Sequence, residues 1–269
     1  MTDKTKWPKL YLFFVFILLY TPIFYLILFS FNTGGTMNNF TGFTLEHYST
    51  VLQDNRLIQI VIQTLLLALL SSFISTVVGT LGAIGIYYVR NVRTQELLLN
   101  ANNILLVSPD VIIGSSFLLL FTIVGFRLGF VSVLLAHIAF SIPIVVLMVL
   151  PSLEEINPSM LKAAEDLGAN GFETLWHIIL PNILPGILSG FFMAFTYSLD
   201  DFAVTFFVTG NGFTTLAVEI YSRARRGVSL EINALSALLF ISSLLLVLGY
   251  YYLSVYSKRV RKVKKVVAE

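Results

Sequence analysis

The stretch Lys162-Ala163-Ala164-Glu165-Asp166-Leu167-Gly168, followed after nine residues by Ile178-Ile179-Leu180-Pro181, is a polar island in an apolar chain. Of the 269 residues, 57% are hydrophobic and only 12% are charged, and the mean hydropathy is +0.85. This composition is typical of a protein embedded in a lipid bilayer. Because charged helices are costly in hydrocarbon, we expect the island to lie outside it and to contact a partner.

Around this island, the chain contains apolar runs long enough to cross a membrane. A helix needs about 20 residues to span ~30 Å of hydrocarbon. We therefore predict an all-α, polytopic membrane protein with a single transmembrane domain over residues 1–269. The first run follows three lysines, as in a signal peptide, but it is too long and lacks a small-residue cleavage site, so we expect it to be retained. The six predicted spans are 10–31, 60–89, 96–124, 130–150, 182–208 and 234–256.

The basic residues predict the orientation of these spans, because short cytoplasmic loops carry an excess of lysine and arginine. With the N-terminus and the C-terminus both cytoplasmic, 12 of the 17 lysines and arginines lie on that side. They include the basic run at 257–265, which we interpret as a solvated stop signal. The loop at about 151–181 is then cytoplasmic, and the loops at about 32–59 and 209–233 are outside. In the first outside loop, we expect a short helix to begin near Thr44.

The cytoplasmic loop has the start and stop signals of two short helices. Pro158 suits the first position of a helix, and Asn157 before it suits the N-cap. Gly168 can adopt the left-handed conformation that ends a helix. Asn170, with Glu173 three residues later, can cap the next helix. The loop therefore predicts a helix, a glycine turn and a second helix.

The spacing of Ala163-Ala164, Gly168, Ile178 and Leu180-Pro181 resembles the signature loop of the permease subunits of bacterial ABC importers. That pattern is Glu-Ala-Ala, three residues, Gly, nine residues, Ile, one residue and Leu-Pro. Lys162 is a departure, because the family usually has Glu there. The resemblance implies a type I ABC importer permease (MetI-like) fold with six transmembrane helices. It also implies that the loop couples to a separate ATPase through Lys162, Ala163, Ala164, Asp166, Leu167, Gly168, Phe172 and Pro181.

A rigid pair of short helices that projects from the cytoplasmic face, here called the knob, suits contact with an ATPase on physical grounds. Ala163 and Ala164 on the surface of the knob would permit close approach. Large apolar side chains would anchor it in a groove of the partner, and the candidates are Leu161, Leu167, Phe172 and Trp176. The alternative interpretation is an amphipathic loop helix that lies on the membrane surface.

The sequence lacks the motifs of an enzyme that would drive transport by itself. It contains no Gly-x-x-x-x-Gly-Lys-Ser/Thr phosphate loop, so another subunit would have to supply the energy of ATP. It also contains no cysteine, no Gly-x-Ser-x-Gly and no His-Glu-x-x-His. We therefore expect a permease subunit that is not an enzyme and that needs no cofactor or metal.

The resemblance extends over most of the chain to spermidine/putrescine permeases. The stretches that carry it are Val107–Asp110, His137, Tyr197–Asp201 and Gly227–Leu235. It implies a second permease subunit, a paralogue rather than a copy, together with two ATP-binding subunits and an extracellular or periplasmic polyamine-binding protein. It also implies the inner or plasma membrane of a bacterial cell as the location, and no nucleic-acid partner.

Two alternatives remain open at this point. The first is an ABC permease for another small solute, such as iron, thiamine, sulfate or phosphonate, which would share the signature loop. The second is an ion-coupled secondary transporter or a membrane enzyme that needs no ATPase.

Asp200 and Asp201 are the first candidates for contact with a substrate. They lie deep in the predicted span 182–208, nearer its outer half, where an ionised carboxylate normally faces protein or a water-filled path. Carboxylates and aromatic faces suit an elongated polycation, and Tyr197 would add such a face. Adjacent residues on a helix point about 100° apart, so one aspartate can pack between helices instead. Asp110, after Pro109, is either a helix cap or a further contact for a polycation.

The last candidates lie in the second outside loop and in the spans. Arg223, Arg225 and Arg226 would repel a polycation, so we assign them to docking an acidic rim of the binding protein, against the alternative of a solvated loop. We expect His137 to be a hydrogen-bonded packing residue. The pair Gly186 and Gly190 would permit close contact between helices.

Overall fold

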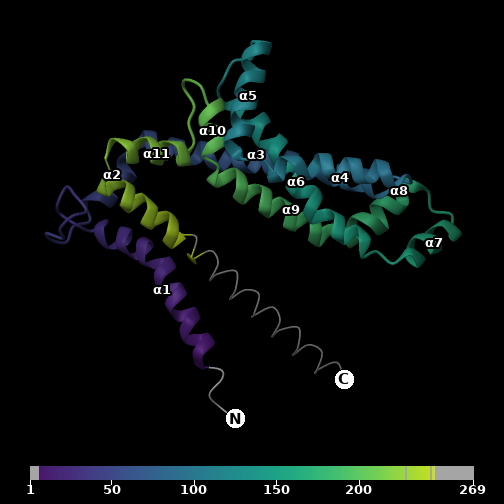
Figure 1. Cartoon of the computed structure of the whole chain (residues 1–269), viewed down its shortest axis with the longest axis horizontal. Helices are drawn as coiled ribbons and strands as arrows, with labels where there is room; N and C mark the ends of the chain where they lie inside the picture. Colours follow the sequence, from purple (N-terminus) through teal and green to yellow (C-terminus); the bar gives the residue numbers. More distant parts are fainter. Residues whose placement is uncertain (1–5, 228, 243, 246–269) are drawn as a thin grey trace. The chain divides into compact units, whose positions relative to one another are not determined.

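The structure is a computed structural model that describes residues 6–227, 229–242, 244 and 245 (Figure 1). In this part of the chain, the regular elements are all helices, and β-structure is limited to an isolated bridge between Asn32 and Phe43. The prediction of an all-α protein is therefore confirmed. The chain divides into two compact units. One consists of Ile58–Tyr221, and the other consists of Met1–Leu57 together with Ser222–Glu269.

The longest helices match four of the predicted spans. Among the described residues, Trp7–Phe29, Asn55–Tyr87, Phe130–Glu154 and Gly171–Asp200 are long and apolar enough to cross a membrane. A bent pair of helices, Val92–Val107 and Asp110–Val124, would supply a fifth span. The sixth predicted span, 234–256, begins within a shorter apolar helix, Leu230–Ser242, and its residues from 246 onward lie outside the described part. The basic run at 257–265 also lies outside it.

The unit Ile58–Tyr221 is built around α6 (Phe130–Glu154), which packs against α9, α10 and α4. The helices of this unit are α3 (Asn55–Tyr87), α4 (Val92–Val107), α5 (Asp110–Val124), α6, α7 (Pro158–Asp166), α8 (Gly171–Thr174), a π-helical turn (Leu175–Ile179), α9 (Leu180–Asp200), α10 (Ala203–Val208) and the start of α11 (Leu216–Arg226).

Glycines allow α9 to approach α6 closely. A Cβ atom built on Gly186 would lie 2.5 Å from the Ser152 hydroxyl oxygen and 3.0 Å from the carbonyl oxygen of Met148. A Cβ on Gly190 would lie 3.2 Å from a methyl group of Val145. Any larger residue at these positions would push the two helices apart, so the predicted close contact at this glycine pair is confirmed.

The third predicted span is not one continuous helix. The predicted span 96–124 is interrupted at Pro109, where a proline kinks a helix: α4 ends at Val107, α5 begins at Asp110, and the two axes are bent by 102°. Pro109 has no N–H to continue the hydrogen-bond ladder, and its ring disfavours helical backbone at the preceding residue. Ser108 accordingly has extended backbone angles, φ −72° and ψ 138°. Asp110 therefore lies at the start of α5, the position that its interpretation as a helix cap requires.

The fifth predicted span is also interrupted. The expectation of one helix over 182–208 is wrong, because α9 ends at Asp200 and α10 begins at Ala203. Asp201 has extended backbone angles, φ −61° and ψ 122°. Its carboxylate accepts hydrogen bonds from the backbone N–H groups of Val204 (3.3 Å) and Thr205 (2.8 Å). These bonds satisfy the free donors at the start of α10, so Asp200 and Asp201 lie at a helix break and not in mid-helix.

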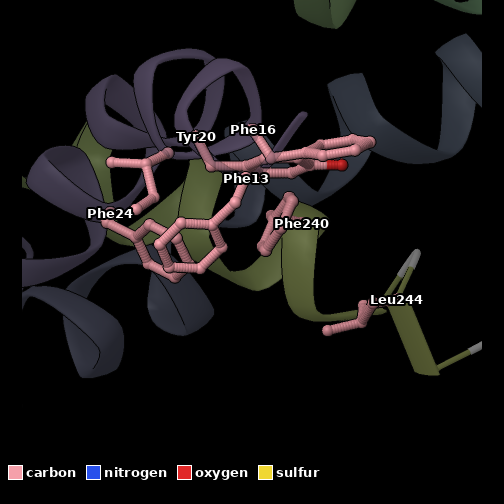
Figure 2. A pocket seen from close by; sticks show the side chains of 7 residues that line it. Phe13, Phe16, Tyr20, Phe24, Phe240 and Leu244 are labelled. Carbon is pink, nitrogen blue, oxygen red and sulfur yellow. The ribbon is translucent and has the colours of Figure 1, made fainter. Parts of the chain in front are cut away.

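The other unit contains α1 (Lys6–Phe29), α2 (Glu46–Gln53) and the helix Leu230–Ser242. An apolar cavity of about 660 Å³ lies in it, lined mainly by aromatic rings (Figure 2). The loop before α2 is organised by the buried Asn32, whose amide donates to the carbonyls of Thr36 and Asn39. The helix expected near Thr44 is confirmed, since the N–H of Glu46 donates to the Thr44 hydroxyl at 3.1 Å. The residues that line the cavity are Phe13, Phe16, Ile17, Tyr20, Phe24, Phe240 and Leu244.

Candidate functional site

The loop between α6 and α9 folds as its capping signals predict. The Asn157 side chain accepts a hydrogen bond from the N–H of Ser159 at 3.0 Å, and Pro158 occupies the first position of α7. Gly168 ends this helix with a φ of +80°, in the left-handed region that favours glycine. Asn170 and Glu173 form a reciprocal capping box at 2.9 and 2.8 Å. The predicted helix, glycine turn and helix are confirmed.

This loop exposes large apolar side chains on an otherwise polar segment. Leu167 is 89% exposed and Phe172 is 72% exposed. The rings of Phe172 and Trp176 lie 6.4 Å apart and nearly parallel, at 10°. A cavity of about 770 Å³ opens beside Leu167 and Gly168. Exposed apolar groups next to a hollow are typical of a surface that binds another protein.

Two residues of the loop face inward, contrary to the expectation that they contact the partner directly. Ala164 is buried rather than at the surface of the knob. Leu161, three residues earlier on the same helical face, packs against a core cluster that includes Leu153 and Ile183. Helix α7 is amphipathic, and the protein's own core covers its apolar face. The remaining predicted coupling residues are exposed, namely Lys162, Ala163, Asp166, Leu167, Gly168, Phe172 and Pro181.

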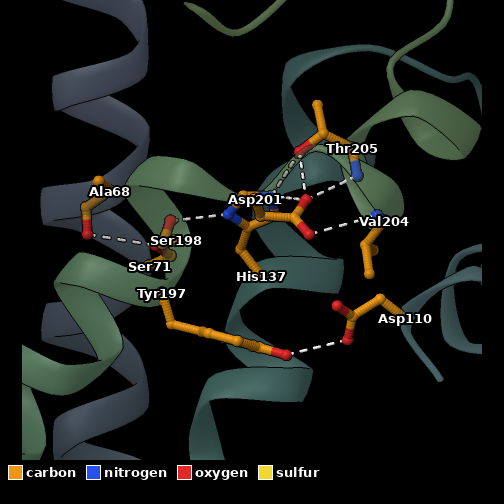
Figure 3. Close-up of polar contacts among 9 residues, drawn as sticks. All are labelled: Ala68, Ser71, Asp110, His137, Tyr197, Ser198, Asp201, Val204 and Thr205. Atoms are coloured by element: carbon orange, nitrogen blue, oxygen red, sulfur yellow. Dashed lines mark hydrogen bonds and ion pairs between the residues drawn. The ribbon is translucent and has the colours of Figure 1, made fainter. Parts of the chain in front are cut away.

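A second polar cluster lies where the two interrupted spans meet α6 (Figure 3). His137, on α6, is completely buried. Its Nδ1 atom lies 2.7 Å from the hydroxyl of Ser198 on α9, and its Nε2 atom lies 2.8 Å from the hydroxyl of Thr205 on α10. The Asp201 carboxylate lies 3.5 Å from Nε2. The expectation of a hydrogen-bonded, packed histidine is confirmed.

The residues predicted to contact the substrate divide into two groups. The Tyr197 hydroxyl donates to the Asp110 carboxylate at 2.9 Å, which joins the end of α9 to the start of α5. Asp200 is exposed, whereas the Asp201 side chain is only 6% exposed and is turned into the histidine cluster. Tyr197 also packs edge-on against Phe140, with ring centroids 5.0 Å apart. The accessible groups are therefore Asp110, Tyr197 and Asp200.

Sequence reasoning did not identify His137 as a residue that supports this site. A signal was present, because an ionisable side chain inside an apolar span is costly and needs partners. Its partners lie 61 and 68 residues away in the chain, so no spacing pattern could name them. Only the packing of α6 against α9 and α10 makes the cluster visible.

The arginines of α11 belong to the unit that contains α1. The Arg223 guanidinium lies 3.3 Å from the Asp54 carboxylate and 3.8 Å from that of Glu231. The backbone N–H of Leu57, and then Arg223, hold the pKa of Asp54 below its usual range. Arg223 therefore takes part in an ion network within its own unit, whereas Arg225 and Arg226 have exposed side chains.

The sequence matches a family model over the part of the chain that contains these features. Residues 75–262 match the model described as "Binding-protein-dependent transport system inner membrane component". The chain belongs to this family. It is therefore a membrane permease component of a binding-protein-dependent transport system and not its ATPase subunit.

The relatives of this permease include proteins named as polyamine permeases. It is 38% identical over 235 residues to the spermidine/putrescine transport system permease protein PotC of Escherichia coli strain K12, covering 87% of this chain and 89% of that protein. It is 38% identical over 237 residues to PotC of Haemophilus influenzae, covering 88% and 92%. It is 33% identical over 242 residues to the putrescine permease PotI of Escherichia coli strain K12, covering 88% and 86%.

Solved structures show the same fold for this permease. A bacterial ABC transporter involved in the import of the acidic polysaccharide alginate has a chain that matches with a TM-score of 0.72 at 17% identity, covering 92% of this chain and 94% of that one. An inward-facing form of the MetNI methionine ABC transporter matches with a TM-score of 0.62 at 18% identity, covering 74% and 95%. The predicted fold of an ABC importer permease is confirmed.

Proposed function

We propose that this permease imports polyamines of the spermidine and putrescine class. The observation that carries the proposal is the group of Asp110, Tyr197 and Asp200 at the ends of two broken helices. In transporters, interrupted helices at membrane depth are tolerated where they line a cavity or lie buried in protein. The relatives named as polyamine permeases, at 33 to 38% identity, support the same substrate class.

The chemistry of these residues suits a chain of ammonium groups. A carboxylate accepts charge-assisted hydrogen bonds from an ammonium, and the face of a tyrosine ring attracts a cation. Asp200 ends α9, where the negative end of the helix dipole also favours a cation. Asp110 and Asp200 would thus bind successive amines of an extended polycation, with Tyr197 between them. Asp201, in contrast, is occupied by its hydrogen bonds to α10.

The same proposal assigns the loop at 151–181 to the cytoplasm, where it would dock on an ATPase. The exposed Leu167, Phe172 and Trp176 would fill a groove of that subunit, and α7 would transmit its movement to the bundle. A working importer would then contain this chain, a paralogous permease, two ATP-binding subunits and an external polyamine-binding protein. Arg225 and Arg226 are the candidates for contact with the binding protein.

Reconstituted transport tests this function. The permease is co-expressed with its partner subunits, purified and inserted into liposomes with the binding protein, and uptake of labelled spermidine is measured with and without ATP. We expect ATP-dependent uptake that unlabelled putrescine reduces and that thiamine, sulfate, phosphonate and iron do not. Uptake of one of those solutes in place of spermidine would overturn the substrate assignment. Uptake driven by an ion gradient without an ATP-binding subunit would overturn the ABC mechanism.

A further inference from the structure

A single imidazole bridges the break between α9 and α10 (Figure 3). The Nδ1 atom of His137 contacts Ser198 at 2.7 Å, on the α9 side of the break. Its Nε2 atom contacts Thr205 at 2.8 Å, on the α10 side. Asp200 lies between these two attachment points in the sequence. The segments on both sides of the exposed Asp200 are therefore hydrogen-bonded to the same rigid ring, that of His137 on α6.

The hydrogen-bond directions show which proton the ring must carry. The Thr205 hydroxyl donates to the Asp201 carboxylate at 2.7 Å. Having given its only proton to Asp201, this hydroxyl accepts from the Nε2–H of His137. On the other side, Ser198 contacts Ser71 of α3 at 2.9 Å, and Ser71 also lies 3.2 Å from the carbonyl of Ala68. The network thus extends from Asp201 through His137 to α3.

The same face of α6 also supports the aromatic member of the path. Phe140 lies three residues after His137, and the centroids of the two rings are 4.8 Å apart. The Phe140 ring packs edge-on against Tyr197, with an interplanar angle of 87°. Phe140 therefore packs against Tyr197, and His137 contacts Ser198 and Thr205, which flank Asp200 in the sequence.

We infer that His137 is a positioning residue of the substrate path, because it holds the α9–α10 break so that Asp200 and Tyr197 stay presented to the polycation. Asp201 is the anchor of α10 in this arrangement and does not contact the substrate. The inference rests on the proposed polyamine function for the identity of the substrate. The bridge itself is argued only from the contacts of His137.

Variants at position 137 separate the two halves of the bridge. The amide nitrogen of glutamine reaches about as far as Nε2, so His137→Gln keeps a donor toward Thr205. The amide of asparagine reaches about as far as Nδ1, so His137→Asn keeps only the contact with Ser198. Ser198→Ala removes the α9 attachment, together with the contact between Ser198 and Ser71 of α3, and leaves the Asp201 side intact.

Ser132→Ala is the matched control. The Ser132 hydroxyl donates to the carbonyl of Val208 at 2.7 Å, so it also joins α6 to α10, but at the far end of α10 from the break. Losing this bond, together with the cap that the Ser132 hydroxyl provides for the N–H of Gly129 at the start of α6, weakens the packing of the same pair of helices without touching either flank of Asp200. The control therefore measures the effect of helix packing alone.

The measurement is the number of spermidine molecules imported per ATP hydrolysed, in liposomes that contain the complete complex and the binding protein. We expect His137→Asn and Ser198→Ala to lower this ratio about tenfold, as expected for the loss of a buried hydrogen bond that positions a binding group. His137→Gln should retain more of the ratio than His137→Asn, and Ser132→Ala should retain the wild-type value. ATP hydrolysis should remain within about twofold in all four.

Two results would overturn the inference. One is an equal loss of the ratio in Ser132→Ala and in the His137 variants, which would mean that the histidine contributes only packing. The other is a wild-type ratio in both His137→Asn and Ser198→Ala. Failure of the proposed function looks different, because the wild-type complex would then import no spermidine. In that case, the same ratio measured with the solute that it does import tests the bridge.

Discussion

The adjacent aspartates at the end of α9 should respond differently to the same substitution. In Asp201→Asn, one carboxylate oxygen becomes an NH₂ group. The native carboxylate accepts from the N–H and hydroxyl of Thr205, at 2.8 and 2.7 Å, and from the N–H of Val204, at 3.3 Å. An amide has one acceptor oxygen, so at least one of these buried donors loses its partner.

The expected loss of stability in Asp201→Asn follows from the burial of these hydrogen-bonding groups. An unsatisfied buried donor costs about 1–3 kcal/mol, and hydrogen bonds to a charged acceptor are at the upper end of the range. We therefore expect Asp201→Asn to destabilise the folded protein by about 3 kcal/mol. Asp200 is exposed, and exposed substitutions usually change stability by less than about 0.5 kcal/mol. Asp200→Asn should accordingly lower polyamine uptake while stability stays unchanged.

The assay compares the two variants in the same detergent and complex. Thermal unfolding midpoints report stability, and ATP-dependent uptake in liposomes reports function. At roughly 2–4 °C per kcal/mol for a chain of this size, Asp201→Asn should lower the midpoint by about 6–12 °C. An unchanged midpoint in Asp201→Asn would refute the anchoring role. Normal uptake in Asp200→Asn would refute its place in the path.

Three further predictions follow from the packing, the coupling loop and the ion network. Gly186→Ala should destabilise the protein by about 1–3 kcal/mol, because Gly186 is in close contact with α6. The control Gly171→Ala, with open space around its Cβ position, should leave stability unchanged, and thermal unfolding midpoints of the two variants measure the difference. Phe172→Ser should reduce co-purification of the ATP-binding subunit without lowering the yield of permease, and an unchanged subunit ratio would count against docking. Because the pKa of Asp54 is lowered, the contacts of its carboxylate with the N–H of Leu57 and with Arg223 stabilise the protein above about pH 4. This stabilisation is lost as the pH falls through the lowered value, so the stability difference from Asp54→Asn should shrink in acid.

The loop at 151–181 was predictable in detail because its structure depends on neighbours in the sequence. The caps at Asn157 and Asn170 satisfy N–H groups two or three residues away, and the Gly168 turn needs only a residue without Cβ. The burial of Ala164 was not predictable in this way. It depends on tertiary packing on the inner face of α7, where Leu161, three residues earlier, packs against a core cluster that includes Val149 of α6 and Ile183 of α9.

The break in the fifth span was missed, and the sharpness of the bend at Pro109 in the third span was not predicted, for a different reason. Hydropathy counts apolar residues and does not distinguish one long helix from two shorter ones joined at Pro109 or Asp201. Pro109 was a visible signal, since a proline removes a backbone donor wherever it occurs. Asp201 was a weaker signal, because an aspartate in an apolar run can cap a new helix, bind a ligand or pair with another helix.

The sequence by itself determined that this protein is a helical membrane permease with a capped loop at 151–181, because hydrophobic length, helix caps and the signature spacing all act over short stretches of chain. Only the tertiary structure decided that Asp201 anchors α10 while Asp200 stays exposed, and that His137 joins the two helices beside them. Asp200 ends α9, whereas Asp201 has extended backbone angles, so the direction of each side chain depends on how the helices pack around the break. The partners of His137, which lie 61 and 68 residues away, meet it only when α6, α9 and α10 pack together.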